Sequence, residues 1–259
     1  MRMMKKVLGT VTVLALSASL LAGCGSTAAS PVSSAASTAA ESTTSSVVSE
    51  TTSAAADENV AAAAQLLNDL TGNYQELWPV ILADEYQQTW LDDCTALVGE
   101  ENAEAAFEKL SSMVTGDVYG EDAVEAYANG GGAYFCGFTN DLATLTFDGE
   151  TSTISGTDKD GNVLFSHTYH YIGMEPVRGL YEFESDDADS GEFTYFFLAP
   201  DTSAETYHIE FRYGSDADAL SQYDAGDYAY WLASGISTDC DQTMIDNCIE
   251  LFCTENLAG

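Results

Sequence analysis

Residues 163–172 read VLFSHTYHYI, a run rich in aromatic and β-branched residues that is typical of a β-strand. Working outward from it, six further short runs of this kind are separated by turn signals such as Asp148-Gly149 and Pro200-Asp201. These runs are Ala133–Phe138, Leu142–Phe147, Ser152–Ser155, Leu180–Glu184, Phe193–Leu198 and Thr206–Tyr213. Six or seven consecutive strands joined by short turns predict an antiparallel sandwich or barrel.

Helical patterns flank these strands on both sides. The segments with helical spacing are Ala61–Leu70, Tyr74–Leu91, Asn102–Val114, Asp122–Ala128, Asp216–Tyr223 and Thr243–Phe252. In the second of these, Pro79 comes early enough to sit in a first turn. The sequence therefore predicts a mostly β fold with flanking helices (α+β): an antiparallel barrel with helices before and after it.

The charge of the chain is strongly one-sided. The 259 residues contain 42 Asp and Glu against 7 Lys and Arg, a formal net charge of −35. Such a surface repels phosphate backbones and anionic lipid headgroups, which excludes nucleic-acid binding and leaves divalent cations as plausible partners. With 46% hydrophobic residues, the chain still has enough apolar mass for one sizeable core.

Residues 1–23 have the pattern of an export signal. A basic end, Met1–Lys6, precedes the apolar run Val7–Leu21, which is short for a membrane span. The run closes on Leu21-Ala22-Gly23-Cys24, which resembles the lipobox of bacterial lipoproteins, in which the cysteine is lipidated. We therefore expect a protein outside the cytoplasm that is held at the cell membrane by lipid on Cys24 only. An ordinary signal peptide with an incidental cysteine is the alternative.

A tether is expected to follow the lipidated cysteine. Residues 24–58 are rich in Ser, Thr and Ala and contain no aromatic residue, so they cannot bury enough surface to fold. Residues 59–259 form the folded domain in this division. The tether is nearly neutral, and the four cations left after signal removal face 42 acids, so a net charge of −38 falls almost entirely on that domain.

Four ordered stretches are similar to the ZinT family of bacterial zinc-binding proteins. They run from Leu70-Thr71-Gly72-Asn73-Tyr74-Gln75 to Trp78-Pro79 and Leu82, then Thr168–Gly173, Phe193–Pro200 and His208–Gly214, the last followed by the aromatic Tyr228–Trp231. The resemblance implies a lipocalin-like (calycin) barrel with added helices, zinc or another divalent cation as the ligand, and delivery to a metal ABC transporter.

The metal ligands of that family are only partly present here. The two histidines of its H-x-H motif fall on His208 and Glu210, and a third on the preceding strand falls on Phe196. Carboxylate oxygen is a normal zinc ligand, whereas phenylalanine binds no metal. On the strand Thr206–Tyr213, alternation places His208, Glu210 and Arg212 on one face. The functional interpretation is a cation site in the barrel mouth. The alternative is a solvated face with a Glu210–Arg212 pair and an idle histidine.

His167 and His170 are further candidate ligands. They are three residues apart on one predicted strand and so face opposite ways, which allows at most one of them to join His208. A strand histidine satisfied by ordinary hydrogen bonds is the alternative for each.

The cysteines and the remaining motifs leave several possibilities open. Besides Cys24 the chain has five cysteines and no C-x-x-C: Cys94, Cys136, Cys240, Cys248 and Cys253. One or two disulfides with a spare thiol, or five reduced thiols, both fit an exported protein. No G-x-S-x-G, H-E-x-x-H or phosphate-loop motif is present, so we expect no enzyme.

Two functional hypotheses follow from the sequence. The first is a lipid-anchored, monomeric zinc-binding protein for metal capture or delivery to an uptake system. The second is a degenerate, metal-free member of the family that uses the barrel as a ligand-binding or interaction module. Phe196 favours the second hypothesis, while His208, Glu210 and the acidity favour the first.

Overall fold

The computed structural model describes residues 58–199, 206 and 208–258, all within one compact unit. Residues 1–57, with the expected signal, Cys24 and nearly all of the tether, lie outside the described residues. Within the described part, no helix combines the length and the apolar character needed to cross a membrane.

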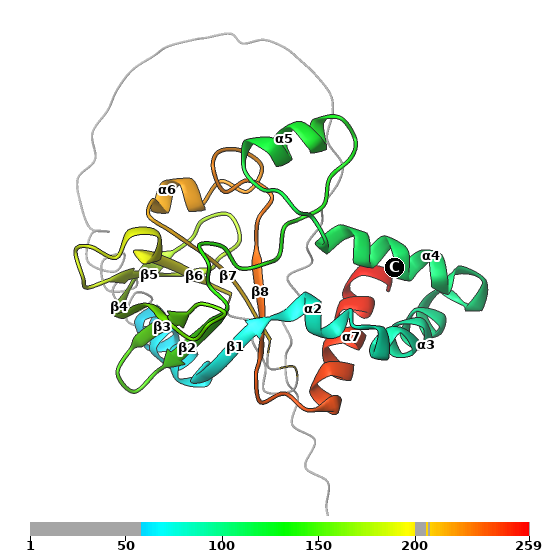
Figure 1. Cartoon of the computed structure of the whole chain (residues 1–259), viewed down its shortest axis with the longest axis horizontal. Coiled ribbons are helices and arrows are strands. Elements are labelled where there is room, and N and C mark those ends of the chain that lie inside the picture. The colour runs from blue at the N-terminus through cyan, green and yellow to red at the C-terminus, as the bar shows by residue number, and fades with distance from the viewer. Residues whose placement is uncertain (1–57, 200–205, 207, 259) are drawn as a thin grey trace, which may run out of the picture. The chain divides into compact units, whose positions relative to one another are not determined.

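Eight strands form a closed barrel in which every strand pairs antiparallel with its neighbour in sequence, and β1 pairs with β8 to close the ring. The strands are β1 Gly72–Glu76, β2 Thr144–Asp148, β3 Thr153–Thr157, β4 Val163–Met174, β5 Tyr181–Ser185, β6 Tyr195–Leu198, β7 His208–Gly214 and β8 Ala233–Ser237. The predicted antiparallel barrel with N-terminal and C-terminal helices is thus confirmed (Figure 1).

Three sequence predictions need correction. Residues 74–76 belong to strand β1 rather than to a helix, and Ala233–Ser237 is a strand that the pattern did not indicate. The expected strand at Ala133–Phe138 makes only isolated bridges, Thr115 with Phe135 and Phe135 with Trp231. Strands β1 and β8 exist because they complete the ring, and such long-range pairing overrides the local pattern.

The larger helices gather beside the barrel, as Figure 1 shows for α3, α4 and α7. The helices are 58–69, α2 Leu77–Ile81, α3 Gln87–Val98, α4 Glu100–Val114, α5 Glu121–Ala128, α6 Ala217–Leu220 and α7 Gln242–Leu257. Trp90 of α3 is fully buried in a hydrophobic cluster shared by α2, α3, α4 and α7, and its Nε1 donates to the Ile81 carbonyl at 2.7 Å. Ile236 of β8 joins this helical cluster to the outer wall of the barrel.

Aromatic rings fill the barrel interior. Phe196 on β6 lies 5.9 Å from Phe165 and 5.4 Å from Tyr169, both on β4, measured between ring centroids. Because β5 lies between these two strands in the ring, the contacts cross the interior. Phe211 and Tyr213 of β7 complete the same stack. The interior is a packed core, as small barrels require.

Buried phenols and thiols predict alkaline instability. Burial raises the pKa of Tyr223, Cys136 and Cys248 to about 12, and it also raises the pKa of Tyr169 and Tyr213. In the unfolded chain these thiols and phenols release protons near pH 9 and pH 10, which the folded chain still retains. Their contribution to stability is complete below about pH 9 and is lost as the pH rises toward 12. We expect the melting temperature to fall steadily across that range, with tyrosinate absorbance rising together with unfolding. A melting temperature that stays constant across it would contradict the prediction.

Candidate functional site

Strand β7 presents two different faces. Ile209, Phe211 and Tyr213 belong to the barrel core, so the alternate residues His208 and Glu210 lie on the outer wall. Both side chains are half-buried. They share one face, as alternation predicts, but that face is the outside of the barrel rather than its mouth.

His208 lies close to helix α7. Its Nδ1 is 2.7 Å from Thr206 Oγ1, and the Thr206 carbonyl accepts a hydrogen bond from Cys248 Sγ at 3.1 Å. Glu210 is opposite Ser234 on β8. Two residues along a strand correspond to about 7 Å, so one cation held between the imidazole and the carboxylate can bridge the His208 and Glu210 side chains.

Arg212, the next residue on this face, holds the chain that follows β7. Its side chain is fully buried, and the guanidinium donates to the carbonyls of Leu220, Gln222 and Tyr228. It also lies 4.4 Å from the centre of the Tyr223 ring. Burial lowers the pKa of Arg212 to about 10, so the group stays charged at neutral pH. The hydrogen-bond donors of the Arg212 guanidinium are therefore directed to carbonyls of the segment after β7.

The two remaining histidines pair with neighbouring aspartates after β5. His167 Nδ1 is 2.7 Å from Asp187 Oδ2, and the His167 side chain is 18% exposed. His170 faces the other way, with its Nδ1 2.8 Å from Asp186 Oδ1 and its Nε2 4.0 Å from Glu184 Oε2. Each histidine thus has a polar partner of its own.

The strand register separates these histidines from His208. His170 is opposite Glu184, which is opposite Tyr195, which in turn is opposite Gly214 at the far end of β7. His208 begins β7, six residues from Gly214 and therefore about 20 Å away along the strand. His170 also lies three strands from β7 in the ring. The four candidate metal residues do not converge on one point.

The third position of the family's metal site lies on the opposite side of the barrel wall. Phe196 is opposite Tyr213 on the core face and is fully buried, whereas His208 and Glu210 are on the outer face. Among the described residues, no group of three or more His, Cys, Asp or Glu side chains is arranged to hold a metal ion. The described residues therefore offer no closed zinc centre, and on β7 they offer the two-donor pair His208 and Glu210.

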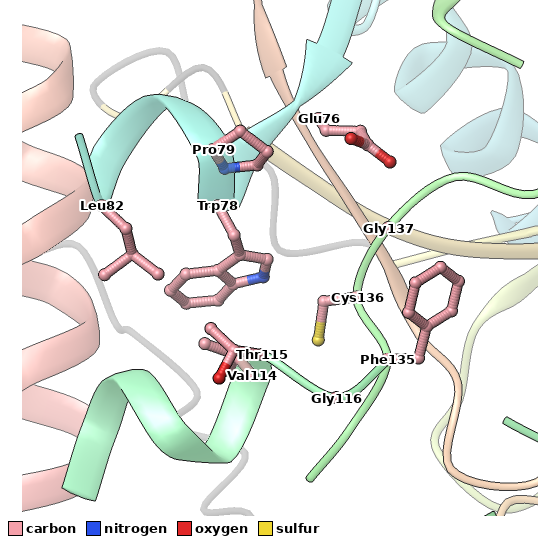
Figure 2. A pocket seen from close by; sticks show the side chains of 10 residues that line it. All are labelled: Glu76, Trp78, Pro79, Leu82, Val114, Thr115, Gly116, Phe135, Cys136 and Gly137. Carbon is pink, nitrogen blue, oxygen red and sulfur yellow. The ribbon is translucent and has the colours of Figure 1, made fainter. Parts of the chain in front are cut away.

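A pocket of about 340 Å³ opens where β1 ends and α2 begins (Figure 2). Beyond Glu76, β1 no longer pairs with β8, and the Cys136 carbonyl takes its place by accepting from Ser234 N at 3.0 Å. A Cβ at Gly137 would come within 2.8 Å of Glu76 Oε1, so a larger residue there would make the Glu76 side chain shift. The pocket is lined by Glu76, Trp78, Pro79, Leu82, Val114, Thr115, Gly116, Phe135, Cys136 and Gly137.

Polar groups at this pocket come from both sides of it. Glu76 Oε1 accepts from Phe138 N at 2.6 Å, which holds the carboxylate at the rim. Trp78 is 8% exposed, and among the described residues its Nε1 has no oxygen or nitrogen acceptor and is directed at the weak acceptor Cys136 Sγ. In Figure 2 the nitrogen edge of this indole turns toward the Cys136 side chain. Burial is the main cause that keeps Cys136 a neutral thiol, followed by the negative charge of Glu210.

Sequence reasoning did not identify this pocket. The sequence places Trp78-Pro79 in a helical segment and in the first ZinT-like stretch, and Cys136 in a predicted strand, and neither pattern indicates a pocket. Glu76 and Gly137 meet because β1 and the segment 135–137 share one edge of β8. No local sequence pattern predicts that Glu76 and Gly137 lie next to each other.

The structure is a closed eight-stranded antiparallel barrel with a helical cluster on its outer wall. The pocket with Glu76, Trp78 and Cys136 lies where the barrel strand β1 leads into the helix α2 of this cluster. The crystal structure of the Zn(II)-bound ZinT-like domain of Streptococcus pneumoniae AdcA is similar, with a TM-score of 0.45 and 16% identity over 71% of this chain and 89% of that one. Zn(II)-bound AdcA from the same organism gives a TM-score of 0.42 and 14% identity over 72% of this chain and 35% of AdcA. No family model and no curated protein matches the sequence.

Proposed function

We propose that the chain is an extracytoplasmic binding protein, lipid-anchored through Cys24, that captures a divalent cation between His208 and Glu210. The observation that carries this proposal is the placement of an imidazole and a carboxylate on the same face of one strand, fixed between two neighbouring strands. Nitrogen and oxygen donors of this kind suit zinc. The resemblance to the ZinT family supports zinc as the first cation to test and an uptake transporter as the recipient.

The net charge of the chain and the number of protein donors determine how tightly this site is expected to hold zinc. The net charge of −35 raises the local concentration of cations near the surface. With only two protein donors, water completes the coordination shell, and zinc is held less tightly than by three imidazoles. Loose, reversible binding suits a protein that passes its metal to a partner.

Removing one donor is expected to weaken zinc binding by about tenfold or more, since even the outer partners of metal ligands contribute that much. The measurement is isothermal titration of the chelator-treated chain with zinc, together with the melting temperature in zinc, for the wild type, His208→Ala and Glu210→Gln. His170→Ala is the matched control, because it removes an imidazole far from β7 and should leave zinc affinity unchanged.

A titration with calcium distinguishes zinc binding at a specific site from general attraction of cations to acidic residues. Calcium avoids imidazole, so its weak binding should be the same in the wild type and in His208→Ala. Zinc that leaves the melting temperature of the wild type unchanged would overturn the proposed function. Zinc that binds His208→Ala as tightly as the wild type would overturn the assignment of the site.

A second candidate function is favoured by the pocket beside α2. Among the described residues its buried Trp78 Nε1 faces only the weak sulfur acceptor Cys136, and Glu76 supplies a carboxylate at the rim. Apolar walls with a few polar groups are typical of sites for small organic molecules. The matching ligand would carry an acceptor for the indole N–H and a donor for the carboxylate. A chain that does not respond to zinc would leave this metal-free function as the better candidate.

A further inference from the structure

The five cysteines of the described part all lie in or against the helical cluster beside the barrel. Cys94, Cys136, Cys248 and Cys253 belong to its buried core, and Cys240 packs against it. In this cluster, Cys94 of α3 and Cys253 of α7 are both fully buried, and their sulfur atoms are 3.9 Å apart. Two thiols on different helices thus face each other across a packed seam.

We propose that Cys94 and Cys253 form a disulfide that joins α3 to the C-terminal helix α7. A disulfide needs the sulfurs at about 2.05 Å, so the two sulfurs must approach by about 2 Å when the bond forms. The packing between α3 and α7 already holds the two cysteines close together. Trp90, one turn before Cys94, has its ring centroid 6.0 Å from that of Phe252, the neighbour of Cys253. The inference does not depend on the cation site, but the proposed extracytoplasmic location provides the oxidising setting.

The reaction is thiol–disulfide exchange with a small-molecule or protein disulfide as the oxidant. One cysteine thiolate attacks a sulfur of the oxidant, giving a mixed disulfide and releasing one thiol. The second cysteine, as its thiolate, then displaces the other half of the oxidant. The two protein thiols lose two electrons and two protons in total, and the oxidant leaves as two thiols.

Burial determines when this bond can form. Burial raises the pKa of both the Cys94 and the Cys253 thiol, so few thiolates exist in the folded reduced protein. We therefore expect oxidation during folding, before the α3–α7 seam closes, and slow oxidation once folding is complete. The same burial shields the finished bond from soluble reductants.

The bond would close a long loop, because the two cysteines are 159 residues apart in sequence. Cross-links over long loops restrict the unfolded chain most strongly. We expect protein refolded with reductant, which lacks the bond, to melt about 5–15 °C below protein refolded with oxidised glutathione.

The experiment refolds the full chain in a buffer of oxidised and reduced glutathione, blocks free thiols with an alkylating agent under denaturing conditions and maps the peptides by mass spectrometry. The expected result is a linked pair of peptides containing Cys94 and Cys253, and two additional alkylated cysteines when a reductant is added first. Wild-type protein suffices for this measurement, so it does not depend on any variant folding.

Variants then connect the bond to stability. Cys94→Ala should melt at the same temperature whether it is refolded with reductant or with oxidised glutathione, whereas the control Cys136→Ala, from the same cluster, should keep the difference. Full alkylation of Cys94 and Cys253 after refolding with oxidised glutathione would overturn the proposal. A map that joins either cysteine to a different partner would also overturn it.

Discussion

Replacing Arg212 with methionine is expected to lower the free energy of unfolding by about 3 to 5 kcal/mol. The guanidinium is fully buried, and it donates to three backbone carbonyls in the segment 220–228, which follows β7. Methionine fills a similar volume but donates no hydrogen bond, so these carbonyls must find water or remain unsatisfied. Chemical denaturation of the wild type and of the variant measures the difference.

Two further variants separate the carbonyl hydrogen bonds of the Arg212 guanidinium from its charge and from its contact with the Tyr223 ring. Arg178 lies 4.3 Å from the Tyr223 ring and is half-buried, so Arg178→Met removes a similar cation–π contact and should cost about 1 kcal/mol or less. Arg212→Lys keeps the charge but cannot reach three carbonyls with one ammonium group, so it should lose most of the stability that Arg212→Met loses. Equal effects at positions 178 and 212 would show that the carbonyl contacts contribute little.

The sequence allowed the barrel to be predicted because most of its strands carry their own signals. In β4 the alternation of Phe165, His167 and Tyr169 with polar residues predicts one buried face, and the structure has it. Strand β8, Ala233–Ser237, consists mainly of small residues and gives no such signal. It is a strand because β7 and β1 pair with it on either side.

The candidate site was predictable only in part, for the same physical reason. Alternation correctly grouped His208 with Glu210 and Arg212 on one face of β7. It could not say which face points into the barrel or what covers the other one. The alternative interpretation placed Arg212 in solvent beside Glu210, yet the chain after β7 folds over Arg212, which donates to its carbonyls. Such coverage depends on distant segments whose positions are set by the whole fold.

Placing a histidine at position 196, the third ligand position of the ZinT resemblance, is expected to destabilise the protein without improving zinc binding. Phe196 is fully buried among Phe165, Tyr169 and Tyr213. An imidazole there leaves a void and buries ring nitrogens in an apolar environment, which costs about 2 to 4 kcal/mol. Thermal and chemical denaturation of Phe196→His measure this cost.

Zinc titration of the same variant tests the geometry. Residue 196 points into the barrel while His208 and Glu210 lie on its outer wall, so the new imidazole cannot share a metal ion with them. We therefore expect zinc affinity equal to that of the wild type. Phe196→Leu is the matched control for packing, with an expected loss of about 1 to 2 kcal/mol and no change in zinc binding. Tighter zinc binding by Phe196→His would mean that the three positions converge, and that β7 turns its His208 face toward the barrel interior.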